Sequence, residues 1–299
     1  MSAAHTLRQQ GFAFSVLALG VSAFSVLGPA WNSSLETAVL ATLIFFLGFP
    51  HGAFDVVFAK RLYRLVSLHQ WAFFCLAYVA LAAVVVGFWW VVPAAFLSAF
   101  LLVSAFHFSG DLDAGSSAIL RFWYGGSMLV FPAWFHEADV ARLFGYLVNS
   151  EFSEQLAGFL NGLALPWCAG LCVTLFFHQR SQWATTLEVI AVAVLATAAP
   201  PLLGFTVYFC VMHSARHAIR TRSFAPDLRW GDLLKKAIAP MTACLLAAVT
   251  LWPSLHGLSF DAAITRVLFV GLAALTVPHM VLIERVRFAS WQGRPDRSL

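Results

Sequence analysis

The chain has 299 residues, of which 61% are hydrophobic and 11% charged, and its mean hydropathy is +0.81. Soluble domains carry about 25% charged residues, so this composition excludes a protein that folds in water. The net charge of +4 is small, and the basic residues lie mainly in short loops. Membrane topology and contacts with lipid headgroups explain these residues better than a nucleic-acid partner does.

Apolar runs recur along the whole sequence. Runs of about 17 to 25 apolar residues suit a hydrocarbon core of about 30 Å and leave no room here for a soluble domain. We expect one membrane domain, residues 1–299, with an all-α fold: a polytopic integral membrane helical bundle of about ten transmembrane helices. The joints at 89–93 and 199–201 have almost no polar loop, and either could be a kink. The expected spans are 11–30, 37–58, 70–91, 93–110, 117–135, 156–177, 184–200, 203–220, 236–252 and 264–284.

Charged loops predict the topology. Basic segments at 60–64 and 220–236 follow the second and eighth spans, and the tail at 285–297 is also basic. Because basic loops stay on the cytoplasmic side, we expect both termini to be cytoplasmic in a bacterial inner membrane. The acidic stretch at 137–154 then falls outside, as an even number of spans requires.

Five of the ten histidines lie within expected spans, where each imidazole must find a hydrogen-bond or metal partner. They occur on the second, fourth, eighth and tenth spans, which all run outward to inward in this topology. Each lies several residues before the cytoplasmic end, so they share one depth. A single metal site requires such a shared layer. These histidines are His51, His107, His213, His217 and His279.

His213 and His217 form an HxxxH pair whose rings project from one helix face. A zincin-type protease would place glutamate after the first histidine, but Ser214 stands there, so metalloprotease chemistry loses support. Neutral imidazole suits iron, copper or zinc. With His51 and His107, the pair predicts a four-histidine site with positions open for dioxygen or water.

Asp55 lies one turn after His51 and is a carboxylate inside a span. We expect this carboxylate to lie outside the coordination sphere, where it accepts a hydrogen bond from the N–H of a ligand histidine and so fixes the tautomer of that ring. The alternative is a carboxylate that reaches toward the cytoplasmic interface. His279 lies in the same layer. It could support a ligand in a similar way, be a fifth ligand itself, or be a histidine that only packs in the bundle.

Three more polar residues lie near this layer. Asp111 and Asp113 follow His107 at a membrane boundary, where solvated loop carboxylates are the default interpretation. Tyr208 precedes His213 by five residues and could face the site. Among 29 phenylalanines and 11 tryptophans, some could line a substrate channel, but no individual one can be chosen.

Four segments together carry a family resemblance. They are GFPHGAFD at 48–55, FHFSGD at 106–111, MHSARH at 212–217 and PHM at 278–280. With them, the chain resembles the bacteriorhodopsin-related Brp/Blh family of membrane β-carotene 15,15′-dioxygenases. The PHGxxD pattern at 50–55 is the most specific element, whereas HxxxH alone is weak.

The resemblance implies oxidative cleavage of the central 15,15′ double bond of β-carotene by O2, giving two retinal molecules at a non-haem Fe(II). The family's iron ligands carry over as His51, His107, His213 and His217. The implied partners are β-carotene or a related carotenoid, O2 and the lipid bilayer. Family membership does not fix the substrate, because a relative could prefer another carotenoid or cut elsewhere.

Two other classes of function stay open. Facing intramembrane histidines on two helices can bind haem axially, as in an electron carrier. A proton-coupled transporter could instead use His51, Asp55 and His279 as protonatable groups. A diiron desaturase would need several more histidine-rich boxes.

Overall fold

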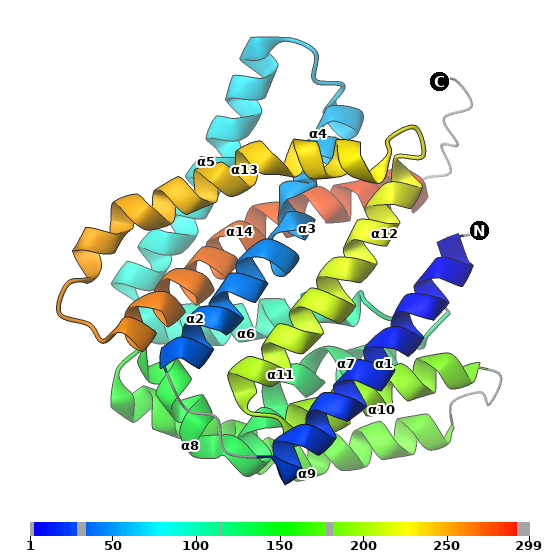
Figure 1. Ribbon diagram of the computed structural model, residues 1–299, viewed down its shortest axis with the longest axis vertical. Helices are drawn as coiled ribbons and strands as arrows, with labels where there is room; N and C mark the ends of the chain where they lie inside the picture. The colour runs from blue at the N-terminus through cyan, green and yellow to red at the C-terminus, as the bar shows by residue number, and fades with distance from the viewer. Residues whose placement is uncertain (1–2, 29–33, 114, 178–181, 292–299) are drawn as a thin grey trace.

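The computed structural model describes residues 3–28, 34–113, 115–177 and 182–291, and every regular element within these ranges is a helix (Figure 1). Among the described residues, six helices are long and apolar enough to cross a membrane. The expected all-α class is therefore confirmed, and the six helices indicate an integral membrane protein. The end of the expected basic tail, from 292, lies outside the described residues.

Most helices are single elements that lie side by side. Within the described residues, α1 lies along α10, α6 along α7, α8 along α9 and α14 along α5. A short 3-10 turn, η4 (Trp252–Leu255), follows α13. The single helices are α1 (Ala3–Leu27), α5 (Leu68–Val91), α6 (Pro93–Ser109), α7 (Ala118–Val130), α8 (Pro132–Gly145), α9 (Ser150–Phe176), α10 (Trp183–Ala198), α13 (Trp230–Leu251) and α14 (Phe260–Trp291).

Two further rods are built from consecutive segments, and both contain a π-helical turn. The first rod joins α2, η1, α3 and α4, and the second joins α11, η3 and α12. π-helical turns inside α-helices occur frequently at functional sites. The segments are α2 (Ser34–Leu43), η1 (Ile44–Gly48), α3 (Pro50–Ala53), α4 (Asp55–Tyr63), α11 (Pro201–Val207), η3 (Tyr208–Ser214) and α12 (Ala215–Phe224).

The π-helical turns η1 and η3 pack against each other at the centre of the bundle. Pro50 follows η1 and has no backbone N–H, so the regular hydrogen-bond ladder is interrupted there. A Cβ atom on Gly48 would overlap the ring of Phe209, so only glycine allows this approach. The close contact brings His51 and His213, one on each rod, toward the same point.

Local sequence explains most helix starts. The side chains of Ser67, Ser117 and Asn149 each accept a hydrogen bond from a backbone N–H three residues later, which caps α5, α7 and α9. Pro93 and Pro201 stand at the first positions of α6 and α11, where a missing N–H is tolerated.

The two joints that lack a polar loop are breaks between helices. Val92 has φ −138° and ψ 68°, and Ala199 has an extended ψ of 148°. Each residue precedes a proline, whose ring disfavours helical geometry in the residue before it. The expected span 117–135 is divided in the structure: α7 ends at Val130, and α8 begins at Pro132 and runs into the acidic stretch 137–154, where a loop was expected.

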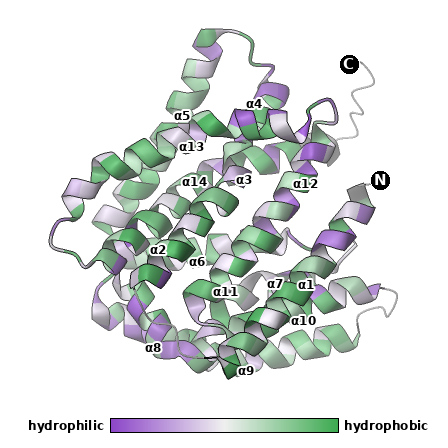
Figure 2. Cartoon of the chain, in the orientation of Figure 1, coloured by the Kyte–Doolittle hydropathy of each residue, from purple (hydrophilic) through white to green (hydrophobic). Residues whose placement is uncertain are grey.

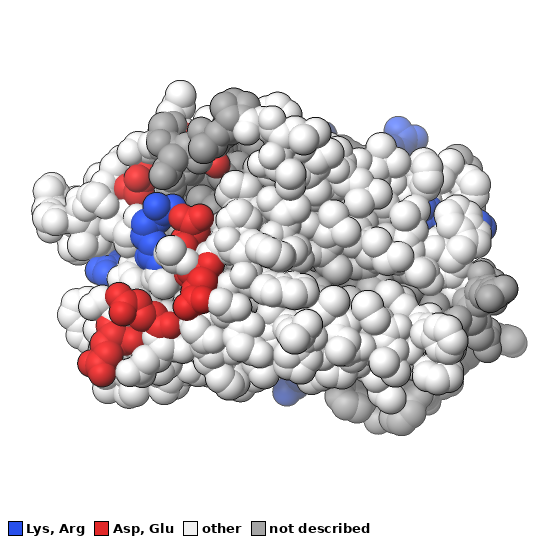
Figure 3. Space-filling model, turned by 90° about the horizontal axis from the view of Figure 1, so that it is seen from below, with Lys and Arg blue, Asp and Glu red and all other residues white. Residues whose placement is uncertain are grey.

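The surface matches a lipid environment. Only 6% of the residues in the most apolar stretch of α5 are buried, and no residue is buried in the corresponding stretch of Trp230–Leu255. Figure 2 shows hydrophobic residues along most of each helix, with hydrophilic residues on α8 and near the ends of α4 and α12. The lower face is mostly uncharged, with a cluster of acidic and basic side chains toward one edge and a few isolated basic side chains elsewhere (Figure 3).

Candidate metal centre

Five histidine rings converge in the interior of the bundle. The ring centroid of His51 lies 4.9 Å from that of His213 and 5.2 Å from that of His279. The centroid of His217 lies 5.5 Å from that of His51 and 5.1 Å from that of His279. His107 completes the cluster at 4.6 Å from His213 and 5.3 Å from His279. All the intramembrane histidines singled out in the sequence therefore meet at one place.

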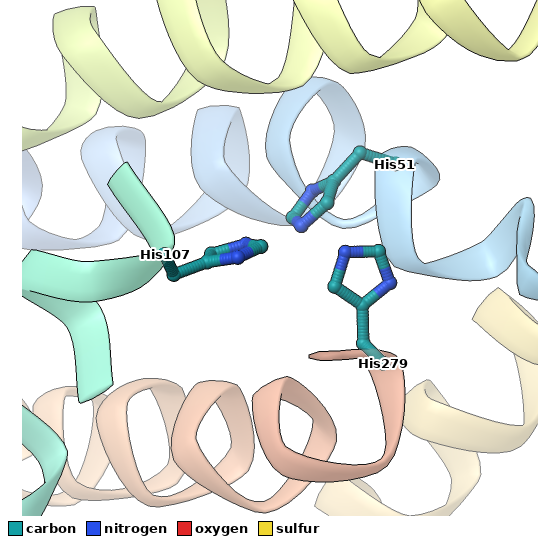
Figure 4. Close-up of side chains that lie close together, drawn as sticks. All are labelled: His51, His107 and His279. Carbon is teal, nitrogen blue, oxygen red and sulfur yellow. The ribbon is translucent and has the colours of Figure 1, made fainter. Parts of the chain in front are cut away.

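His51, His107 and His279 come from α3, α6 and α14 and point toward one another (Figure 4). Each offers one ring nitrogen, and these nitrogens lie within 4.8 Å of one another. Metal–nitrogen bonds are about 2 Å long, so the ligand nitrogens of one ion lie up to about 4 Å apart. The spacing is close to what one bound ion needs, and His279 is part of it.

Two of the rings are held by buried carboxylates. Nδ1 of His213 lies 3.0 Å from Oδ2 of Asp111, and Nδ1 of His279 lies 2.7 Å from Oδ1 of Asp55. A carboxylate accepts, so in each pair Nδ1–H donates and Nε2 is left with its lone pair. Histidines that bind metals usually donate their other N–H to such a partner, which fixes the tautomer and the ring orientation.

Two other rings are held by uncharged oxygens. Nδ1 of His51 donates to the carbonyl oxygen of Gly48 at 2.6 Å. The Thr221 hydroxyl donates to the backbone carbonyl of His217 at 2.9 Å. Its oxygen can therefore accept a hydrogen bond from Nδ1–H of His217, which lies 3.3 Å away. In four of the five rings Nδ1 is therefore occupied, and Nε2 is the nitrogen left for an ion.

The Nε2 atoms of His213 and His279 are buried without a hydrogen-bond partner within the described part of the chain. Both side chains are only 2% exposed. A buried polar atom with no partner costs about 1–3 kcal/mol. Neutral imidazoles that direct lone pairs into one interior space fit a bound transition-metal ion, which would satisfy these atoms.

Asp55 is 3% exposed, so the alternative of a carboxylate reaching the interface is wrong. Besides His279, its carboxylate accepts a hydrogen bond from the hydroxyl of Tyr78 at 2.9 Å. Sequence reasoning missed Tyr78, because it lies on α5, a helix that is largely exposed on the outside of the bundle.

Asp111 is also buried, at 3% exposure, and the prediction of a solvated loop carboxylate is wrong for this residue. Its Oδ2 accepts from the Tyr208 hydroxyl at 2.7 Å as well as from His213. Tyr208 thus faces the site, as the sequence suggested, and acts on it through Asp111. The neighbouring Asp113 is exposed, as expected.

A buried ion pair supports the site from behind. The guanidinium of Arg216 donates to both carboxylate oxygens of Glu188, at 2.7 and 3.0 Å, and to the backbone carbonyl of Asp111 at 2.9 Å. Arg216 lies between His213 and His217 on the chain, so these contacts tie their rod to α10 and to the turn that follows α6. Sequence reasoning missed both charges, although each lies inside an apolar run that demands a partner.

An apolar cavity of about 110 Å³ opens beside the histidines and is bordered by His51 and His107. Its other walls come mainly from α6, α7, α8, α11 and α14. Aliphatic and aromatic side chains dominate this lining, for example Leu101, Phe144 and Phe205. A long hydrocarbon could reach the cluster here without crossing water.

Comparison with known proteins gives one family. Residues 42–286 match the family described as β-carotene 15,15′-dioxygenase. The chain belongs to this family. The resemblance carried by the histidine segments is thereby confirmed.

Two curated relatives agree with the family. A β-carotene 15,15′-dioxygenase of an uncultured marine bacterium, 66A03, is 32% identical to this chain, and the alignment covers 81% of this chain and 90% of the relative. A Halobacterium salinarum protein named "Probable beta-carotene 15,15'-dioxygenase Blh" is 26% identical, with 94% of this chain and 93% of the relative covered. No solved structure matches the chain.

Proposed function

We propose that this protein cleaves β-carotene at its central 15,15′ double bond with O2 to give two retinal molecules, at an Fe(II) ion held by the interior histidines. The observation that carries the proposal is a cluster of buried, tethered histidines beside an apolar cavity. The family of the chain and the substrate in its relatives' names support the same reaction.

The proposed ligands are His51, His107, His213 and His217, with His279 as a fifth ligand, because its ring nitrogen lies within 4.8 Å of those of His51 and His107. The donors are neutral imidazoles, which suit Fe(II), and five of them leave one position of an octahedral ion open. Iron bound there would supply the binding and activation of O2. Asp55 and Asp111 would keep the rings of His279 and His213 in the tautomer and orientation that ligation needs.

The chain's own contribution is position and dryness. The apolar cavity would hold part of the polyene against His51 and His107. Its apolar walls would exclude water, which protects oxidised intermediates from side reactions. A carotenoid dissolved in the bilayer could enter sideways between helices, because the substrate and the helix surfaces share one solvent.

The alternative functions have less support. Five imidazoles with neighbouring centroids 4.6–5.5 Å apart leave no flat space for a porphyrin between them. A transporter could use the pairs of His279 with Asp55 and of His213 with Asp111 as proton carriers, but the family of the chain is one of oxygenases.

We also propose that residues 1–299 form one domain with about ten spans in a bacterial inner membrane and both termini in the cytoplasm. The basic loops at 60–64 and 220–236 support this orientation. The shorter apolar helices α6 and α10, together with α7 and the rod of α11, η3 and α12, would then span along with the six long ones. Labelling of single cysteines placed at 63 and 256 from each side of the membrane would test it, with only the first expected to react from the cytoplasm.

The reaction is tested by expressing the protein in a bacterium that makes β-carotene. Pigment loss and retinal are followed by chromatography, with and without an iron chelator in the assay. We expect retinal from the native chain and from His256→Ala, a control in an exposed loop, and none from His213→Ala. Unchanged β-carotene with the native chain, or retinal from His213→Ala, would contradict the proposal.

A further inference from the structure

A second, smaller cavity borders the histidine cluster from another side. It has a volume of about 30 Å³ and is lined by His107, His213 and His217 together with charged side chains of Asp111, Arg220 and Glu284. A water molecule needs about 10–15 Å³ of such space, so this cavity has room for a few water-sized occupants. Of the histidines, only His107 borders both cavities.

We propose that this polar cavity is the route by which a divalent transition-metal ion reaches the histidine cluster from the aqueous side. The inference rests on the proposed metal centre and goes beyond it, because it gives the two cavities separate tasks. The apolar cavity takes the hydrocarbon, and the polar cavity takes the ion.

Desolvation separates the two routes. An ion that enters a medium of low dielectric without partners loses tens of kcal/mol of solvation by Born estimates. The apolar cavity, with walls such as Leu101 and Phe144, offers almost no oxygen or nitrogen before His51 and His107. The polar cavity offers the carboxylates of Asp111 and Glu284 along the way. A cation therefore meets a much lower barrier on the polar side.

The polar cavity also leads to an atom that lacks a partner. His213 lines it and is 2% exposed, and its Nε2 has no hydrogen-bond partner among the described residues. Nδ1 of the same ring is held by Asp111, so the lone pair of Nε2 is available to an arriving ion. The polar cavity therefore provides both the path for the ion and the first nitrogen that can bind it.

The position of the polar cavity in the fold places it near the aqueous end of the bundle. Arg220 lies three residues after His217 on α12, and Glu284 lies five residues after His279 on α14. The cavity thus runs from the cluster toward the C-terminal ends of these helices, which lie at one edge of the molecule in Figure 1. This is the end that carries the basic loops expected in the cytoplasm.

Arg220 is a cation in the wall of the proposed route. Its guanidinium donates to the backbone carbonyls of Gly110 at 2.8 Å and of Asp111 at 3.0 Å. The same cavity is also lined by two carboxylates, those of Asp111 and Glu284. The clamp also fixes the end of α6, on which His107 lies.

The test is the rate at which metal-free protein in lipid nanodiscs binds Co(II), followed by visible absorption after rapid mixing. Glu284→Lys reverses the charge in the polar cavity, and Glu284→Gln removes it. Glu151→Gln, an exposed carboxylate on α9, is the matched control. Leu101→Trp narrows the apolar cavity instead.

We expect Glu284→Lys to load at least about fivefold more slowly at low salt, with less slowing at high salt, because charge steers the approach. Glu284→Gln should lie between it and the native protein, and all variants should reach the same final Co(II) content. Glu151→Gln and Leu101→Trp should load at the native rate. Native loading by both Glu284 variants, or slow loading by Leu101→Trp, would overturn the route. A native protein that binds no Co(II) would overturn the metal centre itself.

Discussion

Nδ1 of His279 lies 2.7 Å from Oδ1 of Asp55, and this contact joins residues 224 positions apart in the chain. Both side chains are almost fully buried. The same arrangement holds His213 on Asp111, so two carboxylates from distant parts of the chain each orient one ring of the cluster. The clearest consequences concern these two supports.

Replacing Asp55 with asparagine should weaken metal binding by about 10–100-fold, because partners of this kind set the tautomer and basicity of a ligand ring. Competition with a chelator of known affinity measures the effect. Tyr78→Phe removes one hydrogen bond to Asp55 but leaves the contact with His279, so its loss should be smaller. Equal affinities for Asp55→Asn and the native protein would show that Asp55 does not support a ligand.

Asp111 has a matched control two residues away. Asp111→Asn should lower metal affinity and retinal formation by about 10–100-fold, since the residue holds both His213 and Tyr208. Asp113→Asn changes an exposed carboxylate and should leave both quantities unchanged. Similar behaviour of the two variants in chelator competition would speak against a specific role for Asp111.

The buried pair of Arg216 and Glu188 should separate stability from metal binding. Glu188→Gln leaves a buried guanidinium without its partner charge and should cost about 3–5 kcal/mol of unfolding free energy. The double variant Glu188→Leu with Arg216→Met should recover much of this loss, because apolar replacement of a buried pair is often neutral. Thermal unfolding in detergent measures both.

The double variant should still bind metal more weakly, since it lacks the hydrogen bond from Arg216 to the Asp111 carbonyl. Native metal affinity in a stable double variant would reduce the pair to a purely structural element.

If the apolar cavity holds the substrate, filling it should lower retinal formation without changing metal binding. Leu101→Trp fills space beside the cluster and should reduce retinal formation at least tenfold while the iron content stays native. Leu102→Trp is the control, because Leu102 is 73% exposed on the outer side of the same helix. Retinal yield and iron content of the purified variants would be measured together. Equal retinal yields would place the polyene elsewhere.

The all-helical class could be predicted from the sequence, and so could the set of histidines that meet in the interior. Long apolar runs predict membrane helices because a helix satisfies all of its backbone hydrogen bonds within one segment, as the lipid core requires. The five histidines could be placed at one depth because each stands at a similar distance from the expected cytoplasmic end of its span. The part of α8 within the acidic stretch was missed, because its acidic residues resemble a solvated loop.

The supports of the site could not be predicted in the same way. Asp111 follows the end of an apolar run, and its burial depends on Arg216 and Arg220, more than 100 positions away. Tyr78 looks like one more aromatic of a lipid-facing helix. Glu188 did carry a signal, because a carboxylate inside an apolar run needs a partner, and Arg216 is its partner.

X-ray absorption at the iron edge of the purified, iron-loaded protein tests most directly whether the histidines hold one ion. We expect a first shell of nitrogen at about 2 Å with the multiple scattering typical of several imidazoles, and its loss in His213→Ala but not in His256→Ala. A sulfur shell, or iron without imidazole scattering, would contradict a metal centre built from these histidines.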